Sequence, residues 1–406
     1  MSLDTALASA LETRKTAGRY RNRLELASAQ DAQVSVVDTQ ADTTASIANK
    51  QLINFASNDY LGLANHPDIQ HAFIKAAEAY GVGSGASHLV CGHSREHHAL
   101  EEELAAFTGR DRALLFSTGY TANIAVLNTL LDKNDGVLED KLNHASLLDG
   151  GMSSGAQFIR FQHSNLKSAE QQLRRMQACR RKIIAVDAVF SMDGDVAPLP
   201  QLAQLASQND AWLMADDAHG FGVLGKNGAG SAEHFDLNQN QLPIYMATLG
   251  KAVGSFGAFV AGSEALIETL IQFARPYIYT TAMPPAVAAA TRQAIKIIQR
   301  DSERREKLSS LVNYFRRSAD ELGLPLMPSP TAIQPIVLGD DHRVMAVASK
   351  LRDSGFLVGA IRPPTVPEGS GRLRITLSAN HSESQIDELL DTLQQAIFST
   401  ANEEHS

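Results

Sequence analysis

The sequence is poor in cysteine and has no excess of basic residues. Its 406 residues include only two cysteines, Cys91 and Cys179, and their spacing is not that of a metal site. Such low cysteine usage is typical of proteins from a reducing cytoplasm. The formal net charge of −9 argues against nucleic acid as a main partner, because phosphate binding needs a basic surface. We therefore expect a cytoplasmic protein that does not bind nucleic acid.

Long hydrophobic segments are missing as well. No apolar run reaches the roughly 18 residues that a membrane span requires. The stretch from Met1 to Thr5 lacks a basic head followed by an apolar core, so we expect no secretory signal. Neither a GxGxxG nor a Walker pattern occurs, so a dinucleotide or ATP site is not supported. With 44% hydrophobic and 20% charged residues, the composition is that of an ordinary soluble globular protein.

Between Leu100 and Gly262, short apolar runs alternate with stretches of helical periodicity. This alternation predicts βαβ units and a large, mostly parallel, buried sheet with flanking helices. The clearest strands are predicted at residues 52–55, 113–116, 158–161, 183–186, 212–215 and 244–247.

The two ends of the chain differ from this middle part. The N-terminal residues have a helical pattern that ends near Arg23, and a polar stretch runs from Gln40 to Lys50. After Pro285, helices are predicted at residues 286–298 and 305–322, strands at 335–338, 356–361 and 372–377, and an amphipathic helix through Ile386, Leu389, Leu390, Leu393 and Ile397. We therefore expect an N-terminal helical segment (1–50), a large domain (51–285) and a small C-terminal α+β domain (286–406).

Lys251 is the most informative single residue. It stands in the small-residue turn Thr248 to Gly254, after the apolar run of residues 244–247 and before a Gly-rich strand. Such a turn can present the lysine amine to a ligand at the sheet edge, where it can form a Schiff base with an aldehyde. A solvated loop lysine is the alternative that this motif alone leaves open.

Asp216 ends a second apolar run, which begins at Trp212. Open α/β sheets bind their ligands at the carboxyl ends of strands, where this carboxylate is expected. An aspartate beside the ring nitrogen of pyridoxal phosphate keeps that nitrogen protonated, so the ring can accept electrons. A helix cap or a metal ligand is the alternative for Asp216 by itself.

Three further strand ends carry groups that suit the same cofactor. Gly119 follows one strand and opens a helix, whose free amides suit a phosphate. His144 follows another strand, where its ring could stack on a flat cofactor or move a proton. Ser191 offers a hydroxyl after the strand of residues 183–186. A plain loop, a capping histidine and a common turn are the respective alternatives. The coincidence of five such strand ends favours one cofactor site.

Along nearly its whole length the chain resembles the α-oxoamine synthases, a family of fold type I pyridoxal-phosphate enzymes. The resemblance rests on residues 55–63, 83–85, 143–147, 189–194, 216–220, 248–251, 279–285 and 361–367. The last of these, Ile-Arg-Pro-Pro-Thr-Val-Pro, looks like the pimeloyl-using branch of biotin synthesis.

The resemblance implies a role for each matching residue. Lys251 would form the Schiff base, Asp216 would hold the pyridine nitrogen, and His144 would stack on the ring and face the substrate; these three would be catalytic. The other cofactor contacts would be His219 and Ser191 at the phenolic oxygen, and Gly119, Tyr120, Thr248 and a second subunit's Thr281 at the phosphate. Asn58 and Arg374 would hold the amino-acid carboxylate, and Arg21, Arg362 and Thr365 would meet the acyl substrate.

The activity implied is a decarboxylative condensation of L-alanine with a pimeloyl thioester by a cytoplasmic homodimer without a metal. The donor could be carried by coenzyme A or by an acyl carrier protein. One alternative is a glycine-using relative, such as 2-amino-3-ketobutyrate CoA ligase. Another is a dimeric scaffold or regulator that keeps the fold without turnover, which would lack the cofactor's absorbance band.

The sequence also departs from the family. Asp187-Ala188 replaces a common Glu-Gly pair, and residues 87–91 differ from the usual Ser-Arg-Leu-Val-Ser. We expect both to lie outside the cofactor contacts and to affect acyl-chain entry. His93, His97 and His98 lie in a polar segment that begins a helix, and we expect a solvated face there rather than a metal site.

Overall fold

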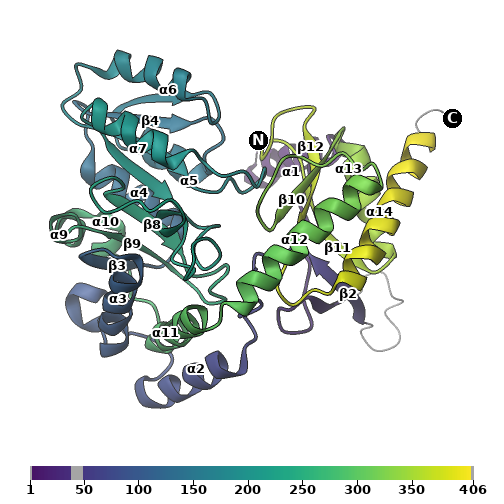
Figure 1. Ribbon diagram of the computed structural model, residues 1–406, viewed down its shortest axis with the longest axis horizontal. Coiled ribbons are helices and arrows are strands. Elements are labelled where there is room, and N and C mark those ends of the chain that lie inside the picture. The colour runs from purple at the N-terminus through teal and green to yellow at the C-terminus, as the bar shows by residue number, and fades with distance from the viewer. Residues whose placement is uncertain (1, 38–48, 404–406) are drawn as a thin grey trace. The chain divides into compact units, whose positions relative to one another are not determined.

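The computed structural model describes residues 2–37 and 49–403, which form two compact units (Figure 1). The first unit contains the two ends of the chain, up to Asn58 and from Lys307 onward, together with Met192–Gly194. The second unit contains Asp59–Ser191 and Asp195–Glu306.

The second unit is built on a seven-stranded sheet with the order β3-β9-β8-β7-β6-β4-β5. Its strands are β3 (Arg112–Phe116), β4 (Gly136–Asp140), β5 (Gln157–Phe161), β6 (Lys182–Asp187), β7 (Trp212–Asp216), β8 (Ile244–Thr248) and β9 (Ala258–Gly262). Only β9 runs antiparallel to its neighbours, β3 and β8, while the other adjacent pairs are parallel. The mostly parallel α/β sheet is therefore confirmed.

Helices surround this sheet. They are α2 (Pro67–Tyr80), η1 (His88–Gly92), α3 (Arg95–Thr108), α4 (Gly119–Leu130), α5 (Ala145–Ser153), α6 (Leu166–Leu173), η2 (Arg174–Met176), α7 (Leu199–Gln208), α8 (Ser231–His234), α9 (Glu264–Phe273), α10 (Arg275–Ile278) and α11 (Pro285–Arg300). One hydrophobic core joins α4 and α9 to the sheet strands, with Val126 and Met246 fully buried in it. Burial on both faces explains why the strand sequences are almost continuously apolar.

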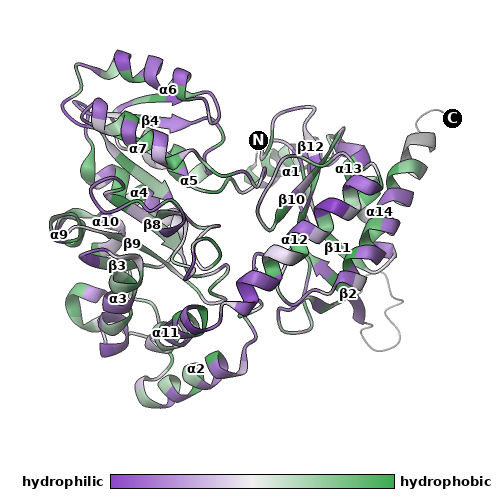
Figure 2. Cartoon of the chain, in the orientation of Figure 1, coloured by the Kyte–Doolittle hydropathy of each residue, from purple (hydrophilic) through white to green (hydrophobic). Residues whose placement is uncertain are grey.

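The first unit contains a five-stranded sheet with the order β1-β2-β11-β12-β10. Its elements are α1 (Leu3–Thr16), β1 (Gln33–Val37), β2 (Asn49–Phe55), α12 (Glu303–Glu321, which begins in the second unit), β10 (Ile333–Gly339), α13 (Asp341–Asp353), β11 (Phe356–Ile361), β12 (Gly371–Thr376) and α14 (Glu383–Glu403). β2 and β11 pair in parallel and the other neighbours are antiparallel. Apolar and polar residues alternate along α14 in Figure 2, and Ile386 and Leu393 are fully buried, which confirms the amphipathic helix.

Several local predictions were wrong. The first helix ends at Thr16 rather than near Arg23, because the chain turns at Gly18 with a φ of 65°, which favours glycine. Strand β1 was not predicted. In the polar stretch that begins at Gln40, residues up to 48 lie outside the described part of the chain, and Asn49 and Lys50 begin β2.

The predicted solvated histidine face is also wrong in part. His98 is exposed, but His93 is half-buried and His97 is 0% exposed. His97 is buried because its ring has partners on both sides: Nδ1 lies 2.9 Å from the Ser94 amide and Nε2 lies 2.7 Å from the Met283 carbonyl oxygen. Among the described residues, no helix has both the length and the apolar character needed to cross a membrane.

Candidate active site

The carboxyl ends of five strands of the second unit surround one cavity. Strands β8, β7, β6 and β4 are parallel neighbours, and β3 has the same direction because β9 is antiparallel to both β3 and β8. The cavity has a volume of about 180 Å³. Its lining includes eight predicted cofactor residues: Gly119, Tyr120, His144, Ser191, Asp216, His219, Thr248 and Lys251. The ninth, Thr281, is exposed before α11 and is not in this lining.

The N-terminus of α4 forms one wall of the cavity. Thr118 caps this helix by accepting a hydrogen bond from the Thr121 amide at 3.1 Å. Gly119 is the first residue of the helix, and a Cβ placed on it would come within 2.7 Å of Thr248 Cγ2. The missing side chain therefore leaves room for a group to approach the free helical amides, and a phosphate is the group that such amides favour.

Asp216 ends β7 with its side chain only 5% exposed. Its Oδ2 accepts a hydrogen bond from Asn123 Nδ2 at 2.7 Å, and its Oδ1 accepts one from the Ala218 amide at 3.0 Å. These two donors fix the orientation of the Asp216 carboxylate in the cavity.

His144 is connected to Asp216 by hydrogen-bonded side chains. Its Nδ1 lies 2.8 Å from Ser146 Oγ, which in turn accepts a hydrogen bond from Asn123 Nδ2 at 2.8 Å. Burial lowers the pKa of His144, and although Asp216 opposes this shift, Lys251 adds to it. The ring is therefore neutral at pH 7, which suits stacking against a flat cofactor.

Asp187 lines the same cavity, whereas sequence analysis placed it outside the cofactor contacts. Burial and the charge of Asp216 raise the pKa of Asp187 well above its usual range. Its Oδ2 accepts a hydrogen bond from the His144 amide at 3.0 Å, while its buried Oδ1 has no partner among the described residues. A buried polar atom without a partner fits a cavity that receives a polar ligand.

His219 faces Tyr60, with 2.6 Å between His219 Nδ1 and the tyrosine hydroxyl. Tyr60 is only 1% exposed, so its hydroxyl group is a fixed partner that orients the His219 imidazole ring. The sequence indicated no role for Tyr60 or Asn123, and Asp187 was expected only to affect acyl-chain entry. Tyr60 and Asp187 stand in or next to recognised motifs, which could have indicated them, whereas Asn123 becomes a candidate only through its contact with Asp216.

The predicted substrate residues Asn58, Arg374, Arg21, Arg362 and Thr365 belong to the first unit and form two groups. Arg374 on β12 donates a hydrogen bond from Nη2 to Asn58 Oδ1 at 3.0 Å. Arg21 Nη2 donates to Thr365 Oγ1 at 3.3 Å, and Arg362 donates to the Gly18 carbonyl oxygen. Arg21, Arg362 and Thr365 line a cavity of about 590 Å³ that Arg19 and Arg352 also line. Arg19 is ion-paired with Asp341 and Glu368. The guanidinium groups of the other three arginines suit an anionic ligand.

Comparison with known proteins connects these sites to a family. The model of the family described as aminotransferase class I and II matches residues 50–393. The 8-amino-7-oxononanoate synthase of Cellvibrio japonicus is 59% identical over 399 residues, which cover 98% of this chain and 97% of that protein. The protein of the same name from Saccharophagus degradans is 56% identical over 403 residues, 99% of each chain.

Solved structures show the same fold. A serine palmitoyltransferase variant from S. paucimobilis, solved with a bound PLP–myriocin aldimine, has a TM-score of 0.90 at 28% identity, covering 99% of this chain and 100% of that chain. The 8-amino-7-oxononanoate synthase of Francisella tularensis has a TM-score of 0.75 at 32% identity, covering 86% of this chain and 99% of its own. The predicted fold type I architecture is confirmed.

Proposed function

Because the chain belongs to the 8-amino-7-oxononanoate synthase family, within the class I and II aminotransferases, we propose that it condenses L-alanine with a pimeloyl thioester. The products would be 8-amino-7-oxononanoate, carbon dioxide and the free thiol carrier. The observation that carries this proposal is the single cavity in which Lys251, Asp216 and the N-terminus of α4 meet.

The chain is an enzyme, and its cofactor is pyridoxal 5′-phosphate. When bound, the cofactor supplies an aldehyde that reacts with the amino group of an amino acid. Its ring then withdraws electrons from the Cα of that amino acid. The amides of Gly119 and Tyr120, together with Thr248, would hold the phosphate, and Thr281 of a second subunit would join them. His219 and Ser191 would contact the phenolic oxygen. The capped helix start, the buried carboxylate and the unpartnered Asp187 Oδ1 all suit these groups.

Lys251, Asp216 and His144 would perform the proton chemistry. The Lys251 amine would hold the cofactor aldehyde until alanine arrives, and its Nζ would then remove the proton from the alanine Cα. The Asp216 carboxylate would keep a proton on the pyridine nitrogen. Neutral His144 would cover the ring and orient the substrate without adding positive charge.

Arg374 and Asn58 would bind the alanine carboxylate. The Arg374 side chain is 6% exposed and is held by Asn58 and by Thr376, whose Oγ1 lies 3.2 Å from Arg374 Nη1. A guanidinium group fixed in this way presents a rigid pair of donors to a carboxylate. Alanine would therefore be held in one orientation while its α-proton is removed.

Arg21, Arg362 and Thr365 would receive the acyl donor. A pimeloyl chain carries a second carboxylate at its far end, and a carboxylate leaves water only when a cation or several hydrogen bonds compensate it. The arginine-lined cavity of the first unit offers such cations. During the reaction the alanine Cα bonds to the thioester carbonyl carbon, the C–S bond breaks, the carboxylate leaves as carbon dioxide, and a proton returns to Cα.

A product assay tests this proposal. The purified enzyme with pyridoxal phosphate is given L-alanine or glycine with pimeloyl-CoA, a pimeloyl acyl carrier protein or acetyl-CoA, and the products are identified by mass spectrometry. We expect the nine-carbon amino-oxo acid from alanine and a pimeloyl donor. A product formed mainly from glycine and acetyl-CoA would instead identify a glycine-using synthase such as 2-amino-3-ketobutyrate CoA ligase. Absence of any product, together with absence of the cofactor absorbance band, would favour a scaffold.

The active form would be a homodimer, because Thr281 is exposed and would serve the phosphate of a second subunit. The low cysteine usage supports a cytoplasmic location for it. Light scattering coupled to size-exclusion chromatography would give the mass in solution. In a mixture of inactive Lys251→Ala and Thr281→Ala chains, recovered activity would show that Thr281 acts in the partner's site.

A further inference from the structure

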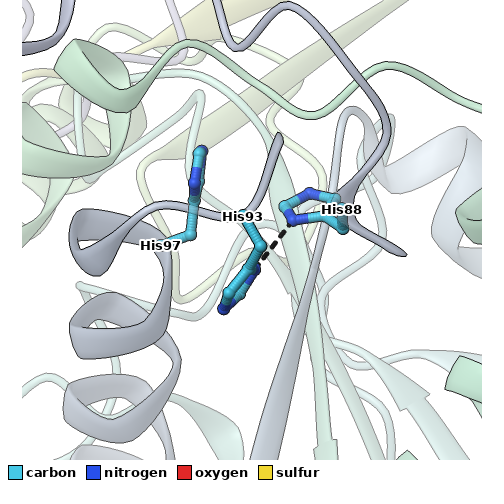
Figure 3. Close-up of side chains that lie close together, drawn as sticks. All are labelled: His88, His93 and His97. Atoms are coloured by element: carbon cyan, nitrogen blue, oxygen red, sulfur yellow. Dashed lines mark hydrogen bonds between the residues drawn. The ribbon is translucent and has the colours of Figure 1, made fainter. Parts of the chain in front are cut away.

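Three histidines gather at the start of α3. His88 lies in η1, His93 in the loop after it, and His97 in the first turn of α3 (Figure 3). Their ring centres form a nearly equilateral triangle with sides of 5.2 Å (His88–His93), 5.1 Å (His88–His97) and 5.7 Å (His93–His97). One ring nitrogen of each lies within 4.8 Å of those of the other two. The cofactor cavity does not include these residues in its lining.

This triangle has the dimensions of a metal site. Zinc binds imidazole nitrogens at about 2.0–2.1 Å in tetrahedral geometry, which sets neighbouring ring centres roughly 5 Å apart. Packing also restricts the rings. His88 is 8% exposed and stacks on Tyr277 with 5.2 Å between ring centres and an angle of 12°. Part of the His93 side chain, 28%, remains exposed, so a cation can reach the cluster from solvent.

The outer nitrogens of two of the rings face acceptors. His97 Nε2 lies 2.7 Å from the Met283 carbonyl oxygen, which can only accept, so Nε2 carries the hydrogen and Nδ1 keeps a lone pair. His93 Nε2 lies 3.9 Å from Glu101 Oε2. A carbonyl or carboxylate behind the ring is the usual arrangement around metal-binding histidines, because it fixes the ring and makes the inner nitrogen a better ligand.

The inner nitrogens of His88 and His93 face each other. Their Nδ1 atoms are 2.9 Å apart, as the dashed line in Figure 3 shows, and two lone pairs at that distance need a shared proton or a cation between them. His97 Nδ1 now accepts a hydrogen bond from the Ser94 amide at 2.9 Å, and the Ser94 hydroxyl also lies 2.9 Å from it. Both capping contacts would lengthen when the nitrogen turned to a metal.

We propose that His88, His93 and His97 bind one Zn²⁺ ion through their Nδ1 atoms, with a fourth position open to water. The ion would tie η1 to the first turn of α3, and through His97 to the segment at Met283. Zn²⁺ binding can be measured without any substrate, so the presence of this site and the identity of the enzyme's substrates can be tested independently.

A second grouping at the same place, His93, His98 and Glu101, competes with this assignment. His98 is exposed, and its Nε2 lies 3.4 Å from Glu102 Oε1. We favour the three-histidine set because its rings are more buried and two of them have acceptors at their outer nitrogens.

Calorimetric titration of the chelator-treated holoenzyme with Zn²⁺ tests the proposal. We expect one ion per chain, and a loss of affinity of about 100-fold or more in His88→Ala and His93→Ala, since even residues behind a metal ligand contribute about 10–100-fold. Glu101→Gln should weaken binding by about 10-fold. The matched control is His71→Ala, which changes an exposed histidine on α2 and should bind Zn²⁺ as the wild type does. The cofactor absorbance band and the melting temperature without metal verify that each variant is folded.

The proposal would be overturned by an absence of stoichiometric Zn²⁺ binding to the wild type, or by unchanged binding in His88→Ala. It would also be overturned if His98→Ala lost as much affinity as His93→Ala while His88→Ala retained it. A measurement on the wild type needs no variant: in the Cu²⁺-loaded protein, pulsed electron paramagnetic resonance counts the bound imidazoles. Three imidazoles would support the site, and fewer would contradict it.

Discussion

Asn123 Nδ2 donates a hydrogen bond to Asp216 Oδ2 across 2.7 Å, and both side chains are buried. The same Nδ2 also reaches Ser146 Oγ at 2.8 Å, so one amide orients the carboxylate and the residue next to His144. The negative charge that the cofactor ring needs therefore has a fixed position before any ligand arrives.

Asp216→Asn should keep the size of the side chain and remove its charge. The single amide oxygen can still accept the hydrogen bond from Asn123, while the Ala218 amide loses its acceptor. We expect the exchange of the α-proton of L-alanine to fall by at least about 100-fold, which corresponds to a barrier increase of about 2.7 kcal/mol. Nuclear magnetic resonance in D₂O measures the exchange, and the cofactor absorbance controls for binding. Nearly normal exchange would rule out the proposed role.

Lys251 should be the one site of covalent cofactor attachment. After borohydride reduction of the holoenzyme, peptide mass mapping should find the label on the peptide that contains Lys251. Lys251→Ala should lose the label, whereas Lys226→Ala, a change at a lysine outside the cavity lining, should retain it. Labelling at another lysine in the wild type would show that the assignment is wrong.

Gly119→Ala should weaken cofactor binding by about 10-fold or more, because the new methyl group would meet Thr248 Cγ2 at 2.7 Å where the phosphate is expected. Equilibrium dialysis of pyridoxal phosphate measures the effect. Gly83→Ala is the matched control, since an added Cβ there meets no atom within 4 Å. Equal affinities in the two variants would place the phosphate elsewhere.

Arg362→Ala should weaken the use of a pimeloyl thioester more than that of a neutral acyl thioester of equal length. The difference should be about 10-fold or more, because moving a carboxylate out of water without a compensating cation costs free energy. Steady-state kinetics with both donors measures it, while α-proton exchange of alanine should persist. Arg362 also donates a hydrogen bond to the Gly18 carbonyl oxygen, so a general structural defect is a concern. Such a defect would depress both donors and the exchange alike, and that pattern would remove Arg362 from acyl recognition.

His163 should make the stability of the folded protein fall as the pH becomes alkaline. Burial by itself lowers the pKa of this histidine, but hydrogen bonds to Asp140 and Asp195, both at 3.0 Å, outweigh it and raise the pKa to about 10. The folded protein therefore holds a proton that the unfolded chain loses near pH 6.5. The stabilisation is complete below about pH 6.5 and is lost as the pH rises through about 10.

Thermal unfolding of the wild type and of His163→Asn between pH 6 and pH 10 checks this dependence. We expect the wild type to melt higher near pH 6 and the difference to shrink as the pH approaches 10. The comparison isolates His163 from the buried acids Glu139 and Asp217, whose pKa values of about 8 and about 7 also make stability fall with rising pH. A difference that stays constant with pH would contradict the ion-pair account.

The sequence by itself determined most strands of the large sheet and the chemistry at their ends. Apolar runs such as residues 212–215 indicate buried strands because both faces of a parallel sheet exclude water, and parallel strands bring their carboxyl ends to one edge. For that reason the sequence alone could assign Lys251, Asp216, His144 and Gly119 to one site, and all four line the same cavity.

The tertiary structure decided which segments are neighbours. β9 lies between β3 and β8, and β2 pairs with β11 from the other end of the chain, because strand pairing depends on hydrogen bonds between distant residues that local periodicity does not record. Local periodicity also could not show that Asn123 and Asp187 belong to the site or that His97 is buried, because these properties depend on contacts between distant residues. Burial and hydrogen-bond partners arise from packing between distant segments. His97 lies in a polar sequence that begins a helix, yet its ring is buried because it contacts the distant Met283 carbonyl oxygen.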